Sequence, residues 1–182
     1  MRTIALVTAL AMLTACQAKE EAQVDPETIE GAEAPAVVNN ATQATMPTET
    51  LSGEAAVAAQ KQRHEDFEKM GDAMKALSRE AKSDTPDMTV VQPNAGIILS
   101  SATALPSWFA PGTGPAAGKT EAKANIWETP DDFKAKAAKF FEVAQSLNDA
   151  ATSGDAAAFK AAMAPTGAAC KACHDTYREE DH

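Results

Sequence analysis

The sequence contains few aromatic residues, and none of them lies in its first third. Aromatic residues make up 5% of the 182 residues, and the first of them is Phe67. A segment without large apolar side chains buries too little surface to offset the entropy that folding removes. We therefore expect one domain of ordinary size, which covers residues 51–182.

Positive charge is also scarce. The chain has 16 Lys and Arg residues against 26 Asp and Glu residues, which gives a formal net charge of −10. A negative surface is repelled by phosphates, so this balance excludes nucleic acid as an expected partner. It suits solubility, or docking to a basic partner protein.

No apolar run in the sequence approaches the length of a membrane-spanning helix. The longest such run near the N-terminus extends from Ile4 to Leu13 and follows the single charge of Arg2. Spanning a bilayer takes about 20 residues, whereas a short apolar run after a positive charge is typical of an export signal. We expect a signal peptide at residues 1–15 and a periplasmic location.

The end of this run suggests a lipid anchor. Residues 13–16 read Leu-Thr-Ala-Cys and resemble the lipobox of bacterial lipoproteins, in which the cysteine is acylated. This resemblance implies lipidation of Cys16 and attachment to a membrane. An ordinary secretory signal with an incidental cysteine is the alternative. Residues 16–50 are rich in Ala, Glu, Thr and Pro, so we expect them to form a flexible tether.

Four stretches of the remaining chain have the composition and periodicity of helices. Residues 51–82 are rich in helix formers and place Phe67, Met70, Met74 and Leu77 along one stripe. Residues 92–105 form a less regular second helix that stops at Pro106. We expect Ile97, Ile98 and Leu105 to be its buried residues.

The last two helices have clearer ends. The third opens at Thr129, a candidate cap, with Pro130 in the first turn, and it ends at Gly154. Its apolar stripe consists of Phe133, Ala137, Phe140, Phe141, Ala144 and Leu147. Asp155 caps the fourth helix, which continues to Tyr177 with a kink or restart expected around residues 164–167. No segment alternates like a strand, so the predicted fold is all-α, an antiparallel up-and-down four-helix bundle.

Two of only three cysteines lie in a Cys-x-x-Cys-His motif on the fourth helix. Residues three and four apart share a helix face, so Cys170, Cys173 and His174 are expected to point toward one object. This spacing matches covalent attachment of haem c, with two thioethers to the porphyrin and the imidazole on the iron. We therefore predict a haem covalently bound to Cys170 and Cys173, with His174 as axial metal ligand.

Three other uses of the motif remain open at this point. A zinc site needs about four ligands, and the other candidates are His64, His182 and Cys16. A thioredoxin-type redox pair expects a βαβ setting, which the helical pattern does not supply. A structural disulfide suits an exported protein but gives no role to the adjacent histidine.

Several separated stretches together resemble the cytochrome c′ family, the class II c-type cytochromes. They are RHEDFEKM in the first helix, LPSWFAPGTG in the middle loop, IWETPDDFKAKAAKF at the third helix and CKACHDTYR near the end. The resemblance covers roughly residues 60–180. It implies a four-helix bundle with covalently bound haem, and it adds the possibility of a homodimer.

In this family, function depends on the residue that faces the iron opposite the axial histidine. By the family's register, Arg63 leads to Phe67, an apolar residue that cannot coordinate, and this implies a five-coordinate iron. The alternative is that Met70 binds the iron, which would then be six-coordinate and suited to electron transfer. Arg63 is expected either near a haem propionate or at the surface. The resemblance places Arg178 beside the proximal face, where it would influence ligand exchange.

These expectations favour a haem protein that binds small diatomic gases (NO or CO), transfers electrons to redox partners, or does both. Enzymatic turnover is not expected, because a peroxidase needs a distal base and a charge stabiliser that an apolar pocket lacks. A non-haem metal-binding helical module is the remaining alternative.

Overall fold

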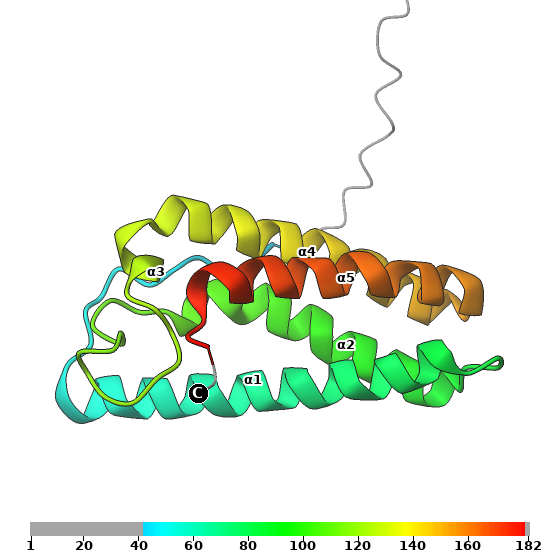
Figure 1. Cartoon of the computed structure of the whole chain (residues 1–182), viewed down its shortest axis with the longest axis horizontal. Helices are drawn as coiled ribbons and strands as arrows, with labels where there is room; N and C mark the ends of the chain where they lie inside the picture. The colour runs from blue at the N-terminus through cyan, green and yellow to red at the C-terminus, as the bar shows by residue number, and fades with distance from the viewer. Residues whose placement is uncertain (1–41, 181–182) are drawn as a thin grey trace, which may run out of the picture. The chain divides into compact units, whose positions relative to one another are not determined.

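The computed structural model describes residues 42–180, and helices occupy most of that range. The four long helices are α1 (Gly53–Lys82), α2 (Met88–Ala104), α4 (Pro130–Ser153) and α5 (Ala156–Tyr177). The connection between α2 and α4 contains a 3-10 helix, η1 (Leu105–Trp108), and the short helix α3 (Asn125–Glu128). Successive long helices run in opposite directions and pack α1 on α2, α2 on α4 and α4 on α5 (Figure 1). Within residues 42–180 no strand forms, so the predicted antiparallel four-helix bundle is confirmed.

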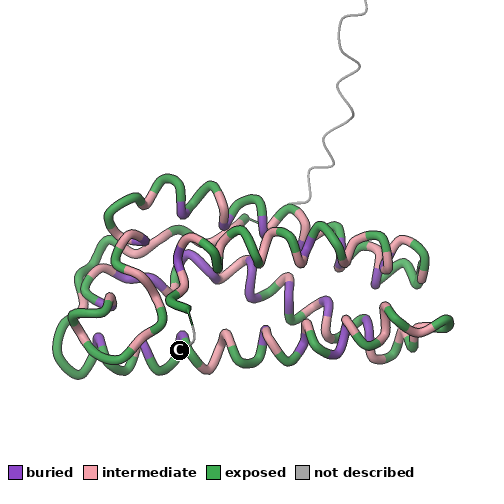
Figure 2. Tube along the Cα trace, in the orientation of Figure 1, coloured by how far each residue is buried: buried purple, intermediate pink, exposed green. Residues whose placement is uncertain are grey.

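The core lies where the long helices face one another. Buried residues recur along all four helices, and Figure 2 shows these positions of the chain in purple. The expected stripe on α4 is buried except for Phe141, which is half-buried and packs against the same cluster. Leu77, Ile98, Leu147 and Phe159 are among the largest fully buried side chains. Their burial holds the bundle together, since each apolar side chain removed from water contributes about 1.5–3 kcal/mol.

The junction between α4 and α5 has the expected end signals. Gly154 has a φ of 74°, a left-handed conformation that ends α4. The carboxylate of Asp155 accepts hydrogen bonds from the backbone N–H groups of Ala157 and Ala158, both at 2.9 Å. Helix α5 runs unbroken through Pro165, so the restart expected around residues 164–167 is wrong. The three residues of the motif therefore belong to one long helix.

The cap predicted at Thr129 is wrong in its chemistry. Thr129 occupies the residue before α4, but its hydroxyl makes no cap hydrogen bond to that helix. It donates instead to the carbonyl oxygen of Asn125 at 2.8 Å. The short helix α3 brings that carbonyl within reach, and the sequence pattern had not indicated this helix.

Helix α2 differs from its prediction at its start and in one buried residue. It begins at Met88, four residues before the expected position, because Asp87 accepts a hydrogen bond from the backbone N–H of Thr89 and caps it. Ile97, expected to be buried, is 39% exposed. The buried positions Val91, Ala95, Ile98, Ala102 and Leu105 follow steps of three and four, which turn Ile97 toward the outside.

The segment that precedes α1, residues 43–51, packs against the bundle. The side chain of Gln43 donates to the carbonyl oxygens of Ala102 at 2.9 Å and Ala137 at 3.0 Å. The backbone N–H of Ala44 donates to the carbonyl oxygen of Thr103 at 2.8 Å. The expected boundary at residue 51 is therefore too late, and this part of the predicted tether belongs to the domain.

This N-terminal segment ends against the connection between α2 and α4. The backbone N–H of Leu51 donates to the carbonyl oxygen of Pro111 at 2.8 Å. Gly112 has a φ of 83°, and a Cβ there would lie 2.0 Å from the carbonyl oxygen of Leu51. Only glycine allows the two backbones to approach this closely.

Some predictions concern residues outside the described range. The signal peptide at residues 1–15, the lipobox with Cys16, residues 16–41 of the tether and the candidate ligand His182 are among them. Among residues 42–180, none of the helices has the length and apolarity needed to cross a membrane.

Candidate cofactor site

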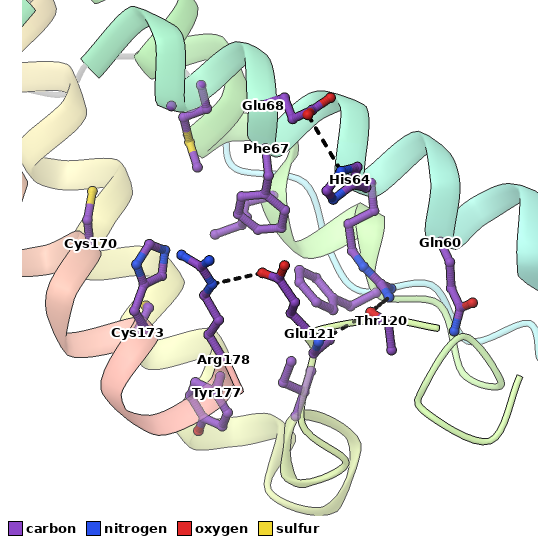
Figure 3. Close-up of a pocket in the computed structure, with 18 of the residues that line it drawn as sticks. Gln60, His64, Phe67, Glu68, Thr120, Glu121, Cys170, Cys173, Tyr177 and Arg178 are labelled. Carbon is purple, nitrogen blue, oxygen red and sulfur yellow. Dashed lines mark hydrogen bonds and ion pairs between the residues drawn. The ribbon is translucent and has the colours of Figure 1, made fainter. Parts of the chain in front are cut away.

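A cavity of about 1150 Å³ opens between α1, α5 and the connection between α2 and α4. Typical small-molecule sites occupy about 300–1,000 Å³, so this cavity has the size for a large cofactor. Figure 3 shows side chains from all three elements directed into it. Of the predicted site residues, the cavity brings together seven, which are Arg63, Phe67, Met70, Cys170, Cys173, His174 and Arg178.

The Cys-x-x-Cys-His motif lines one wall of the cavity. Cys170, Cys173 and His174 lie on the last two turns of α5, and all three border the same space. Neither cysteine forms a disulfide. Burial raises the pKa of both thiols, that of Cys173 to about 11, so both are protonated at neutral pH. A redox pair needs an accessible thiolate, whereas protonated neighbouring thiols pointing into a large cavity suit attachment to a cofactor.

His174 projects into the cavity from the end of α5. Partial burial lowers its pKa, and the positive charge of Arg178 lowers it further. The imidazole is therefore neutral at pH 7 and retains a nitrogen lone pair for a metal. Across residues 42–180 no group of three or more His, Cys, Asp or Glu side chains is placed to hold a metal ion by itself. The described donors therefore fit a metal held by a porphyrin rather than a zinc site.

Helix α1 forms the opposite wall with Phe67 at its centre. Phe67 on this helix and His174 on α5 both border the cavity, and Figure 3 shows Phe67 directed into it. The ring of Phe67 meets that of Trp108 edge to face at 5.3 Å, and that of Phe109 at 6.3 Å. These contacts restrict the ring of Phe67.

Two other residues of α1 had been weighed as iron ligands. Met70 is 8% exposed, packs in the apolar core and also borders the cavity. The side chain of His64 is 66% exposed and lies 3.6 Å from the carboxylate of Glu68 at the cavity mouth. Met70 is therefore the better placed of the two for a role inside the cavity.

Arg63 is not at the surface, so that alternative is wrong. It is 3% exposed, and burial lowers its pKa to about 10, which leaves it charged at neutral pH. Its guanidinium donates to the carbonyl and hydroxyl oxygens of Thr113 and to the hydroxyl of Thr120, each at 3.0 Å. It also donates to the carbonyl of Trp108 at 3.3 Å. Arg63 thus fastens the middle connection to α1, while a contact with a haem propionate stays a prediction.

The loop residues that receive these bonds were missed by sequence reasoning. Thr113 is fully buried, and its carbonyl also accepts a hydrogen bond from Gln60 at 3.2 Å. The indole N–H of Trp127 donates to the carbonyls of Phe109 and Ala110, both at 3.1 Å. Trp127 thus anchors the middle connection through its indole. The threonines gave no periodic signal, because their partners lie about 50 residues away in the chain.

Arg178 lies one turn beyond His174 and borders the same cavity. Its Nε donates to a carboxylate oxygen of Glu121 at 2.8 Å, a contact visible in Figure 3. Glu121 comes from the middle connection, and no sequence pattern had indicated its role.

Comparison with known proteins gives consistent matches over this region. The family model described as cytochrome c′ matches residues 58–178. The cytochrome c′ of Pararhodospirillum photometricum is 44% identical over 109 residues, which cover 60% of this chain and 86% of that protein.

Solved structures match as well. A cytochrome c′ with a ligand-controlled dimer dissociation superposes with a TM-score of 0.64 at 27% identity, over 71% of this chain and all of that one. A ferrous variant of the cytochrome c′ from Alcaligenes xylosoxidans with bound NO superposes with a TM-score of 0.61 at 30% identity, over 73% of this chain and all of that one.

Proposed function

The chain belongs to the cytochrome c′ family of c-type haem proteins, and we propose that it binds small neutral diatomic gases at a five-coordinate haem iron. One observation carries this proposal: Phe67 on α1 and His174 on α5 line one large cavity. A bound haem supplies an iron, and that iron keeps an open coordination position when only one protein residue binds it. No substrate turnover is part of the proposal.

The motif on α5 holds the cofactor in this proposal. Cys170 and Cys173 carry the thioether bonds, and His174 is the axial ligand. Support comes from their common position at the cavity and from the neutral imidazole. The family is defined by covalently bound haem c, which requires such a pair of thiols.

The opposite wall determines which molecules enter. Phe67 has no lone pair to donate, and its aromatic neighbours Trp108 and Phe109 add no base or charge at that point. Anions and water lose hydrogen bonds on entering an apolar space, whereas NO and CO lose little. The wall therefore selects for neutral diatomic molecules and gives no assistance to O–O bond cleavage.

The absorption spectrum of the ferrous holoprotein without added ligand tests the coordination. We expect a high-spin, five-coordinate spectrum for the wild type and a six-coordinate, low-spin spectrum for Phe67→Met, because the new thioether reaches the iron. The control is Phe141→Met on α4, which packs against the core but does not border the cavity. A low-spin wild type, or a Phe67→Met spectrum equal to that of the control, would overturn the assignment of Phe67.

Electron transfer through a six-coordinate iron is the second candidate, and the position of Met70 favours it. Met70 borders the cavity three residues after Phe67. If Met70 is the ligand, the wild type is low-spin and Met70→Leu converts it to high-spin. If Met70 is only a core residue, that substitution leaves the spin state unchanged.

We further propose that the protein is exported to the periplasm and acylated at Cys16. The apolar run that ends in a lipobox supports this. Mass spectrometry of the mature N-terminus tests it, and an unmodified Cys16 thiol would exclude the anchor. A homodimer is proposed by analogy with the relative whose dimer dissociates under ligand control. Sedimentation of the holoprotein with and without CO tests this proposal.

A further inference from the structure

The middle connection reaches α5 at the residues that follow His174. A single antiparallel bridge joins Ala122 to Arg178. The backbone N–H of Lys123 donates to the carbonyl of Tyr177 at 2.9 Å, and that of Glu179 donates to the carbonyl of Glu121 at 2.8 Å. These bonds fix the loop backbone beside the end of the helix that carries the axial ligand.

The side chains continue this contact toward the cavity. The Nε of Arg178 donates to a carboxylate oxygen of Glu121 at 2.8 Å, and both residues border the cavity together with His174. Figure 3 shows the carboxylate of Glu121 directed at the guanidinium of Arg178.

The helix itself does not fix the direction of the Arg178 side chain. Helix α5 ends at Tyr177, and Arg178 has an extended backbone with φ −107° and ψ 135°. An arginine side chain loses up to about 2 kcal/mol of rotamer entropy when it is held in one conformation. A partner on another element is therefore needed to hold it, and the carboxylate of Glu121 is such a partner.

We propose that Glu121 is a positioning residue that holds the guanidinium of Arg178 against the proximal imidazole and so sets the environment of the bond between His174 and the metal. This inference rests on the proposed function, because it takes His174 as the axial ligand. It assigns a role to a loop residue that contacts neither the motif nor the opposite wall.

The test compares holoprotein variants by two measurements. The first is the iron–histidine stretching band in the resonance Raman spectrum of the ferrous form, and the second is the midpoint reduction potential. Glu121→Gln is expected to shift both the band and the potential, because the guanidinium of Arg178 is no longer held beside the imidazole. Glu121→Asp retains a carboxylate and is expected to restore most of the wild-type values. Wild-type values for both measurements in Glu121→Gln would overturn the proposal.

A matched control separates this role from a general effect of charge. Glu142→Gln removes an exposed carboxylate on α4 that pairs with Lys139 at 2.8 Å, away from the cavity. It is expected to leave the band and the potential unchanged. Equal shifts in Glu142→Gln and Glu121→Gln would overturn the proposal.

A double-mutant cycle separates positioning from a direct effect of the Glu121 charge. If Glu121 acts through Arg178, then Glu121→Gln has no further effect on the band once Arg178→Gln is present. Additive shifts would overturn the positioning role. A wild type without an iron–histidine band would instead refute the proposed five-coordinate iron. In that case the cycle is read from the potential alone, where additivity again refutes the role of Glu121.

Discussion

Replacing the buried Arg63 by methionine should remove a large part of the stability of the domain. The guanidinium makes four hydrogen bonds to neutral oxygens, from 3.0 to 3.3 Å. Hydrogen bonds that involve a charged group contribute about 1.5–3 kcal/mol each, so four of them give about 6 kcal/mol at the low end of that range. Burial lowers the pKa of Arg63 to about 10, a fall that corresponds to a desolvation cost of about 3 kcal/mol.

The difference between these two contributions is about 3 kcal/mol in favour of the native arginine. Methionine fills much of the same volume but leaves the carbonyls of Thr113 and Trp108 without this donor, which adds about 1–2 kcal/mol. We therefore expect Arg63→Met to lower the free energy of unfolding by about 4–5 kcal/mol, out of the 5–15 kcal/mol typical of a domain.

Urea unfolding of the ferric holoprotein, followed by far-ultraviolet circular dichroism, measures this loss. The matched control is Arg79→Met, which makes the same change at an exposed position of the same helix and should cost less than about 0.5 kcal/mol. A loss below about 1 kcal/mol in Arg63→Met, or equal losses in the two variants, would show that the buried cation does not hold the connection.

Three further outcomes are expected from single substitutions. Gln43→Ala should lower the unfolding free energy in urea by about 1–2 kcal/mol, because two partly buried hydrogen bonds are lost. A value near zero would mean that the N-terminal segment adds no stability. Gly154→Ala should lower the unfolding free energy by about 1–2 kcal/mol, because Gly154 has a φ of 74°. Gly167→Ala inside α5 should raise the unfolding free energy by about 0.5–1 kcal/mol. Changes of the same sign in the two variants would contradict this reasoning. Trp108→Ala should accelerate CO association to the ferrous protein about two- to tenfold in flash photolysis, because it releases the ring of Phe67, and an unchanged rate would refute that coupling.

The helices were predictable because their signals are local. Gly154 and Asp155 mark one junction within two residues, and the stripe on α4 is complete within six turns. The start of α2 was missed because Pro93 lies inside the helix, in its second turn, where a proline normally ends or kinks a helix. Ile97 and Ile98 are equally apolar, so composition could not indicate which of the two faces the core.

The cavity wall on α5 was also predictable, since the spacing of its motif places three residues on one helix face. The role of Arg63 was not, because its partners lie 45 to 57 residues away in a loop without periodicity. The packing of residues 43–51 was not predictable for the same reason, because the partners of this segment are distant in the chain. Their composition resembles a tether, yet Gln43 finds acceptors 59 and 94 residues further along the chain.

The N-terminal segment also has a mechanical consequence. A force applied to the chain at residue 42 first acts on the hydrogen bonds of Gln43 and Ala44 to α2 and α4. Helix α1 begins nine residues after Ala44, at Gly53. Because the load passes into α2 and α4, the helix that carries Phe67 is shielded from it. The cavity wall around Phe67 is thereby isolated from any force that the preceding chain transmits.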